Sequence, residues 1–134
     1  MPLPITSATT ALLALLLLTL AILTVRHRFR LKVGFGDAGD GGLIAASRSH
    51  GNLAEHAPIV LIMLGLLEYG GANAQLLMGL AGAFVIGRVA HAIGLHGKDE
   101  PGKPPLMRQA GVILTWLVML VLIVMLLLGV FARS

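Results

Sequence analysis

The sequence contains no cysteine and few charged or aromatic residues. The absence of cysteine excludes a disulfide framework, a thiolate zinc or iron–sulfur site and a cysteine nucleophile. Only 12% of the residues are charged and 57% are hydrophobic, whereas soluble domains typically contain about 25% charged residues. Because so little charge cannot cover the surface of a soluble domain, we predict an integral membrane protein.

Four apolar segments are long enough to cross a bilayer, which takes about 20 residues for about 30 Å of hydrocarbon. Helices are therefore predicted over residues 5–25, 42–69, 73–95 and 107–131. They form one all-α domain over residues 1–134, an integral membrane four-helix bundle. Basic residues follow the first segment instead of preceding it, which is the reverse of a cleavable signal peptide, so we expect this helix to be retained.

The basic residues predict the orientation of the chain. Nine of the ten fall at the end shared by the first and third loops: Arg26, Arg28, Arg30, Lys32, Arg48, Arg88, Lys98, Lys103 and Arg108. The positive-inside rule makes that end cytoplasmic and places both termini outside the cytoplasm. The same rule explains the formal net charge of +4, so we expect no nucleic-acid partner.

Polar residues in the second segment are spaced to share one helical face. Arg48, Asn52, Glu55 and His56 stand at i, i+4, i+7 and i+8, and ionisable groups within spans are costly enough to be functional candidates by default. An amide, a carboxylate and a guanidinium on one face provide more hydrogen-bonding capacity than one ion pair uses. Two structural alternatives stay open, namely an arginine that extends to lipid phosphates and an ion pair through Glu55 that joins two helices.

Other polar residues extend this candidate site. Arg88 and His91, at i and i+3, share a face of the third helix, and Arg108 lies in the first turn of the fourth. A metal site is not expected, because His50 and His56 are six residues apart, on opposite sides of a helix, and no HExxH pair exists.

Four features have structural interpretations. Gly79, Gly82 and Gly87 suit close helix packing. Glu68 and Tyr69 are expected to cap their helix and anchor it in the interface. Trp116 is expected to face lipid or to pack. The glycine-rich segment 34–42 follows a membrane helix and lacks the P-loop lysine, so we interpret it as a turn closing over a site and not as a phosphate cradle.

The chemistry of the candidate site indicates its ligand. Guanidiniums bind carboxylates in bidentate fashion, and a carboxylate binds an ammonium. A small zwitterion with excess negative charge therefore fits, and glutathione, which has two carboxylates, one amine and a thiol, fits well. A nearby arginine would stabilise its thiolate, and an apolar co-substrate could arrive from the lipid.

The stretch Arg48–Pro58 resembles the signature of the MAPEG superfamily, membrane-associated proteins in eicosanoid and glutathione metabolism. Gly87–Gly94 and the start of the fourth helix at Arg108 resemble the family too, and the glycine-rich loop is similar to a bacterial branch. The resemblance implies a homotrimer in the bacterial inner membrane. It also implies glutathione bound between neighbouring subunits near the cytoplasmic face.

The resemblance also implies residue roles. Arg48, Asn52 and Glu55 would hold the charged ends of glutathione, with Arg26 reaching a carboxylate and Arg88 lining the same cleft. His91 and His56 would line the cleft as well, and Arg108 would be the catalytic residue that stabilises the thiolate.

The chain departs from the family pattern where family enzymes carry tyrosine. It has His56, His91 and Leu95 at those positions, and its single tyrosine, Tyr69, lies at the opposite end. The sequence is therefore consistent with two functions. One is a glutathione-dependent transferase or peroxidase acting on lipophilic electrophiles or hydroperoxides. The other is a non-catalytic protein that binds glutathione or anionic lipid. A transporter or channel is the least favoured, because four helices are few and no inverted repeat is evident.

Overall fold

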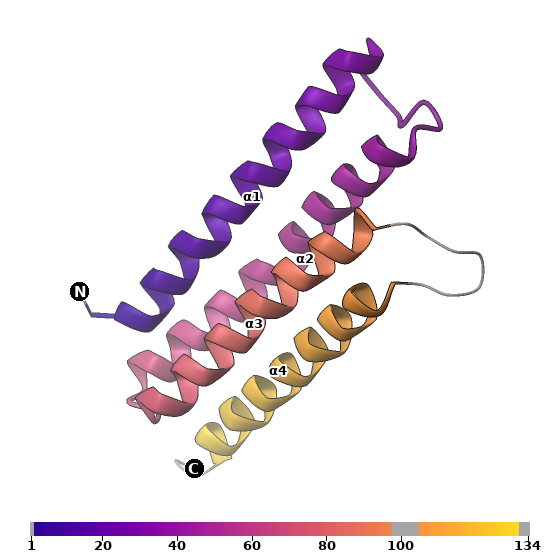
Figure 1. Cartoon of the computed structure of the whole chain (residues 1–134). Coiled ribbons are helices and arrows are strands. Elements are labelled where there is room, and N and C mark those ends of the chain that lie inside the picture. Colours follow the sequence, from indigo (N-terminus) through magenta and orange to yellow (C-terminus); the bar gives the residue numbers. More distant parts are fainter. Residues whose placement is uncertain (1, 98–104, 132–134) are drawn as a thin grey trace.

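A computed structural model describes residues 2–97 and 105–131. Its four α-helices are α1 (Pro4–Leu31), α2 (Gly41–Tyr69), α3 (Ala74–Leu95) and α4 (Leu106–Phe131). They lie side by side, with the start of α1 and the end of α4 at the same end of the bundle (Figure 1). Each is long and apolar enough to cross a membrane, so the described part of the chain is an all-helical membrane protein with four candidate spans.

The predicted bounds of α2, α3 and α4 agree with the structure to within one residue, but α1 is longer than expected. It continues past Val25 through the basic residues and ends at Leu31. Arginine and leucine are good helix formers, and no glycine or proline interrupts the chain there. The helix ends where Lys32 adopts a left-handed conformation with φ 56°, and the Val33 amide donates to the Arg28 carbonyl at 3.1 Å.

Helices α3 and α4 approach each other closely because glycine stands on both sides of the contact. A Cβ atom added to Gly111 would lie 2.6 Å from the Gly87 carbonyl oxygen and 2.7 Å from the His91 amide nitrogen. The prediction for Gly87 is therefore confirmed. Gly79 and Gly82 make no close contact within the described chain, since a Cβ atom at either would meet no described atom within 4 Å.

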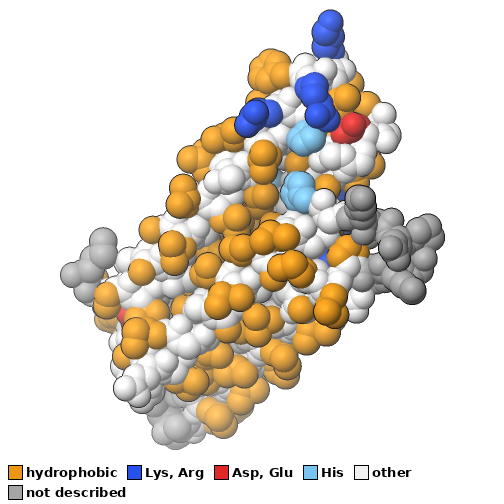
Figure 2. Space-filling model, viewed as in Figure 1, with side chains coloured by type: hydrophobic (Ala, Val, Ile, Leu, Met, Phe, Trp, Pro, Cys, Tyr) orange, Lys and Arg blue, Asp and Glu red, His pale blue; other side chains and the backbone are white. Residues whose placement is uncertain are grey.

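The core lies along the bundle axis and is made of aliphatic side chains around Phe84, which is fully buried. Leu13 and Leu20 contribute from α1, Val60 and Leu64 from α2, and Leu122 from α4, to one continuous cluster. Within the described residues, α1 and α4 make no contact with each other. The outer surface is also apolar (Figure 2), as expected for helices that face lipid.

Glu68 caps a helix, but a different one from that expected. Its carboxylate accepts hydrogen bonds from the Ile5 and Thr6 amides, both at 2.8 Å, and from Thr6 Oγ1 at 2.7 Å. It therefore caps the N-terminus of α1, where unpaired amides and the helix dipole favour a negative charge. Tyr69 is 84% exposed, in keeping with an interfacial position.

The described Lys and Arg residues lie in the parts of the four helices nearest the α1–α2 and α3–α4 connections, which gather at one end of the bundle (Figure 1). On the face drawn in Figure 2, blue side chains gather at the same end. Lys98, Lys103 and Arg133, which also entered the orientation prediction, lie outside the described residues.

Candidate functional site

A cavity of about 190 Å³ opens at the polar end of the bundle, between α2, α3 and α4. Six of the eight predicted site residues line it, together with three apolar ones: Arg48, Asn52, His56, Arg88, His91, Leu95, Arg108, Val112 and Trp116. The fold therefore brings together side chains from three helices, and the six predicted residues are up to 60 positions apart in the sequence.

Arg88 is the most buried cation of the cavity, with 3% of its surface exposed. Its Nη1 donates to the Asn52 side-chain oxygen, and its Nη2 donates to the Gly111 carbonyl at 3.3 Å. Its Nε has no hydrogen-bond partner, and no acidic side chain forms an ion pair with it in the part of the chain that the structure describes. A buried charge without a counter-ion is expensive, so an anion placed beside Arg88 would be stabilised.

The Gly111 carbonyl oxygen links the cavity to the packing of α3 and α4. It accepts from Arg88 and also from Thr115 Oγ1, at 2.8 Å. Arg88 reaches this carbonyl because Gly111 has no side chain to hold the two helices apart. The close contact of α3 and α4 therefore positions the guanidinium.

Two imidazoles in the cavity are oriented by backbone carbonyls. His56 Nδ1 lies 2.8 Å from the Asn52 carbonyl, and His91 Nδ1 lies 3.3 Å from the Arg108 carbonyl. Because a carbonyl oxygen can only accept, Nδ1 carries the proton in each case. In a neutral ring this leaves the Nε2 lone pair available as a proton acceptor or hydrogen-bond acceptor.

The cavity is strongly electropositive. Arg48, Arg88 and Arg108 line it with the two histidines, and none of its described lining residues is acidic. Positive charges gathered in a low-dielectric cleft raise the local concentration of anions. The arrangement can bind a carboxylate or phosphate and can stabilise a thiolate.

Glu55 and Arg26 do not line this cavity within one chain. Glu55 is exposed on α2, and at about 100° per residue it projects about 100° away from His56 around the helix axis. Arg26 lines a separate cavity at the end of α1, with Leu23, His27 and Arg30. Both positions are compatible with a site that a neighbouring copy completes.

The sequence interpretation missed Val112 and assigned Trp116 only a packing or lipid-facing role. Both line the cavity, and Trp116 is also 62% exposed. Their spacing of four residues from Arg108 was the available signal, because i, i+4 and i+8 lie along one side of a helix.

Comparison with known proteins identifies the family of the chain. The chain matches the MAPEG family over residues 6–128, which include all four helices except their outermost residues. It is 30% identical over 110 residues to "Inner membrane protein YecN" of Escherichia coli K12, an overlap that covers 82% of this chain and 80% of that protein. The protein of the same name from Escherichia coli O6:H1 matches equally. No solved structure matches the chain. By the extent of these matches, this four-helix membrane protein belongs to the MAPEG family.

Proposed function

We propose that the chain is a glutathione-dependent membrane transferase or peroxidase that acts on lipophilic electrophiles or hydroperoxides. The observation that carries the proposal is a membrane cavity lined by three arginines, with no acidic side chain among its described lining residues. Such a cavity requires an anionic ligand, and family membership favours glutathione among small anions.

Glutathione fits the charge of the cavity and points to an oligomer. Its two carboxylates suit bidentate pairing with guanidiniums, and its ammonium needs a carboxylate that the cavity of a single chain does not supply. The volume of about 190 Å³ is below the roughly 300–1,000 Å³ typical of small-molecule sites. We therefore propose a homotrimer, in which Glu55 and Arg26 complete the site between neighbouring copies.

Arg108 is the proposed catalytic residue, because a guanidinium beside the sulfur lowers the pKa of the bound thiol. The free Nε2 of His56 can take the thiol proton. The resulting thiolate then forms a bond to the electrophilic carbon, whose leaving group departs with the bonding electrons. With a hydroperoxide the sulfur attacks the terminal oxygen, the O–O bond breaks and the alkoxide takes a proton to leave as an alcohol. A second glutathione then converts the sulfenic acid to glutathione disulfide and water. Arg88 and Asn52 hold the anionic ends of glutathione in place.

The lipophilic substrate would enter from the bilayer beside Trp116, whose side chain touches both the cavity and the outer surface. By the positive-inside rule we place the cavity at the cytoplasmic face and both termini on the other side. The relative named as an inner membrane protein favours the bacterial inner membrane.

The test is turnover of a chromogenic electrophile, and separately of a lipid hydroperoxide, by purified protein with glutathione. Arg108→Ala should lower turnover at least about tenfold, since removing one donor to a developing anion commonly costs that much or more. Lys32→Ala, on the same side of the bundle but lining neither this cavity nor the one that contains Arg26, serves as the matched control. Native-chain turnover equal to the blank, with the oligomer intact, would rule out the enzyme.

A non-catalytic glutathione-binding or anionic-lipid-binding protein is the second candidate. It is favoured by one observation: the described lining residues include no tyrosine, serine or threonine to donate a hydroxyl to the sulfur. Calorimetry that detects glutathione binding in the absence of turnover would select this candidate. Binding unaffected by both Arg48→Ala and Glu55→Gln would contradict the shared site in either form.

A further inference from the structure

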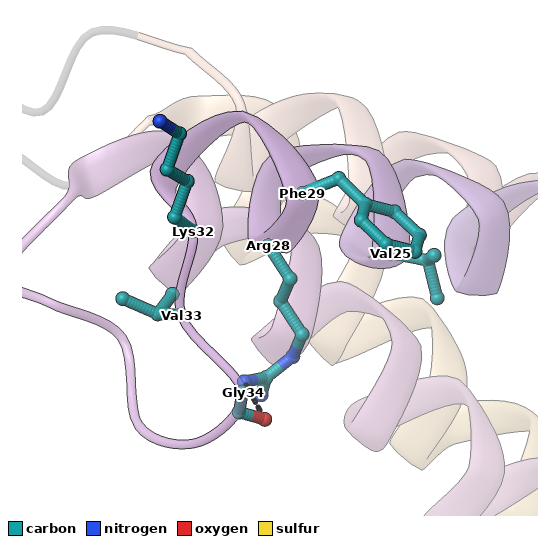
Figure 3. A pocket seen from close by; sticks show the side chains of 6 residues that line it. All are labelled: Val25, Arg28, Phe29, Lys32, Val33 and Gly34. Carbon is teal, nitrogen blue, oxygen red and sulfur yellow. Dashed lines mark hydrogen bonds between the residues drawn. The ribbon is translucent and has the colours of Figure 1, made fainter.

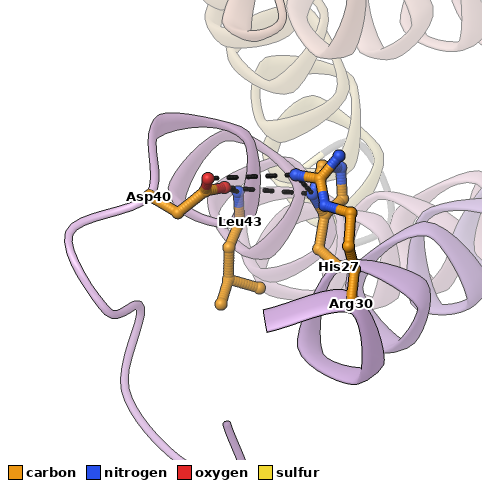
Figure 4. Close-up of polar contacts among 4 residues, drawn as sticks. All are labelled: His27, Arg30, Asp40 and Leu43. Atoms are coloured by element: carbon orange, nitrogen blue, oxygen red, sulfur yellow. Dashed lines mark hydrogen bonds and ion pairs between the residues drawn. The ribbon is translucent and has the colours of Figure 1, made fainter. Parts of the chain in front are cut away.

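The last two turns of α1 carry basic side chains on two faces, and only one face has a counter-ion. Arg30 Nη2 lies 3.8 Å from one oxygen of Asp40, and His27 Nδ1 lies 3.9 Å from the other. The same carboxylate caps α2 by accepting from the Leu43 amide at 2.8 Å (Figure 4). Arg30 therefore has its counter-ion within the chain.

Arg28 and Lys32 have no such partner. Neither forms an ion pair with an acidic side chain among residues 2–97 and 105–131. Arg28 Nη1 instead donates to the Gly34 carbonyl at 3.0 Å (Figure 3). The left-handed Lys32 turns the chain back toward Arg28, so this guanidinium is held in place and keeps its remaining donors for a ligand.

These two cations border a cavity of about 420 Å³ that also has an apolar wall. The wall consists of Val25, Phe29 and Val33, and Gly34 closes the cavity. Phe29 is 80% exposed, so its ring is accessible to an apolar ligand. The cavity therefore offers cationic donors and apolar contact to the same ligand.

An exposed apolar stripe leads from this cavity along α1 into the membrane. Its members recur at steps of three or four residues and are 48–80% exposed: Leu15, Leu18, Ile22, Val25 and Phe29. Residues at that spacing share one helical face. An acyl chain has the length and the chemistry to lie along such a stripe.

The depth of the cavity agrees with a lipid headgroup. The uncharged part of α1, residues 5–25, spans about 31 Å at a rise of about 1.5 Å per residue, close to the hydrocarbon thickness of a bilayer. Arg28 and Lys32 follow directly and so lie at the level of the phosphates.

We propose that Arg28 and Lys32 bind the phosphate of an anionic phospholipid, whose acyl chain lies along Val25 and Phe29. The site is separate from the cavity between α2, α3 and α4, and it does not depend on the proposed enzymatic function. The ligand class is an acylated phosphodiester with a net negative charge. A free phosphate lacks the acyl chain, and a zwitterionic lipid lacks the net negative charge.

The test is native mass spectrometry of the purified protein with equimolar phosphatidylglycerol and phosphatidylcholine of the same acyl chains. The native chain should retain phosphatidylglycerol preferentially. Arg28→Gln and Lys32→Gln should each lower that preference about fivefold, the effect expected of one cation near an anionic surface. Arg30→Gln is the matched control, because it removes the same charge two residues away where Asp40 already neutralises it. It should keep the preference.

A second comparison distinguishes lipid from free phosphate. Phe29→Asn should weaken retention of the lipid, and soluble glycerol phosphate should not displace it. Displacement by glycerol phosphate would assign the site to free phosphates and overturn the proposal. Equal loss of the lipid preference in Arg30→Gln and Arg28→Gln would also overturn it, as would a native chain that shows no preference. Dissociation of an oligomer by Arg28→Gln, without any effect on lipid retention, would overturn it too.

Discussion

The guanidinium of Arg88 donates a hydrogen bond to the side-chain oxygen of Asn52, and this contact joins α3 to α2 at the polar end of the bundle. Asn52 is the one side chain that accepts a hydrogen bond from this buried cation in the described structure; the other acceptor is the backbone carbonyl of Gly111. The pair therefore links the packing of α2 against α3 to the position of the cation in the cavity.

Replacing Asn52 by Leu should destabilise the protein by about 1–3 kcal/mol, because Arg88 would keep its buried charge and lose an acceptor. Asn52→Asp should restore stability by supplying an acidic acceptor, yet should weaken glutathione binding, since the cavity would lose net positive charge. Thermal unfolding in detergent and calorimetric titration measure the two effects. Equal stability of the Leu and Asp variants would contradict this role of Asn52.

Replacing Gly111 by Ala should separate α3 from α4 and lower stability by about 1–3 kcal/mol, because the added methyl group meets backbone atoms that cannot rotate away. Gly79→Ala, where the added atom meets nothing within 4 Å, is the matched control. It should leave the melting temperature unchanged or slightly raised, since alanine is a better helix former than glycine. Similar melting temperatures for both variants would refute the close contact.

Replacing His56 by Gln should lower turnover about a hundredfold if its Nε2 accepts the thiol proton, a typical contribution of a general base. His50→Gln, on the same helix but outside the cavity, should retain native turnover. Binding of S-methylglutathione, which has no thiol proton to lose, should persist in His56→Gln. Its loss would mean that His56 binds the ligand and does not act as the base.

Replacing Glu68 by Ala should destabilise the protein by about 0.5–2 kcal/mol, the usual cost of losing a helix cap. Glu68→Gln keeps a hydrogen-bond acceptor and should recover part of that loss. Because Glu68 lies at the end of the bundle away from the cavity, neither variant should change the affinity for glutathione. A changed affinity with unchanged stability would contradict the capping role.

Hydrophobic runs and charge predicted the four helices, and the four-residue steps from Arg48 to Asn52 to His56 predicted one wall of the cavity. The rotation of α2 about its own axis could not be predicted from the sequence. Its polar face is about 100° wide, and the spacing of the residues does not determine which edge of that face meets α3. Glu55 lies on the edge that faces outward. The sequence also predicted too early an end for α1. Charged residues end the part of a helix that can lie in hydrocarbon, but the helix itself can continue through them.

The position of Trp116 at the cavity could not be predicted from the sequence either. A tryptophan in a long apolar helix fits lipid contact as well as it fits a cavity, and only the packing of α4 against α3 and α2 places it at the cavity. The packing of α4 against α3 depends on Gly111, where a side chain would meet backbone atoms of α3. The sequence of α4 alone does not indicate that contact.

Acidic residues at the two ends of α2 hold the two ends of α1: Glu68 binds the amides of Ile5 and Thr6, and Asp40 lies beside His27 and Arg30. Leucine-rich helices in lipid pack almost equally well after sliding by one turn, because apolar contacts there have little directional preference. A slide of one turn, about 5.4 Å, would break the contacts at both ends together. Two carboxylates therefore fix the register of α1 against α2, a choice that the apolar surface between them leaves open.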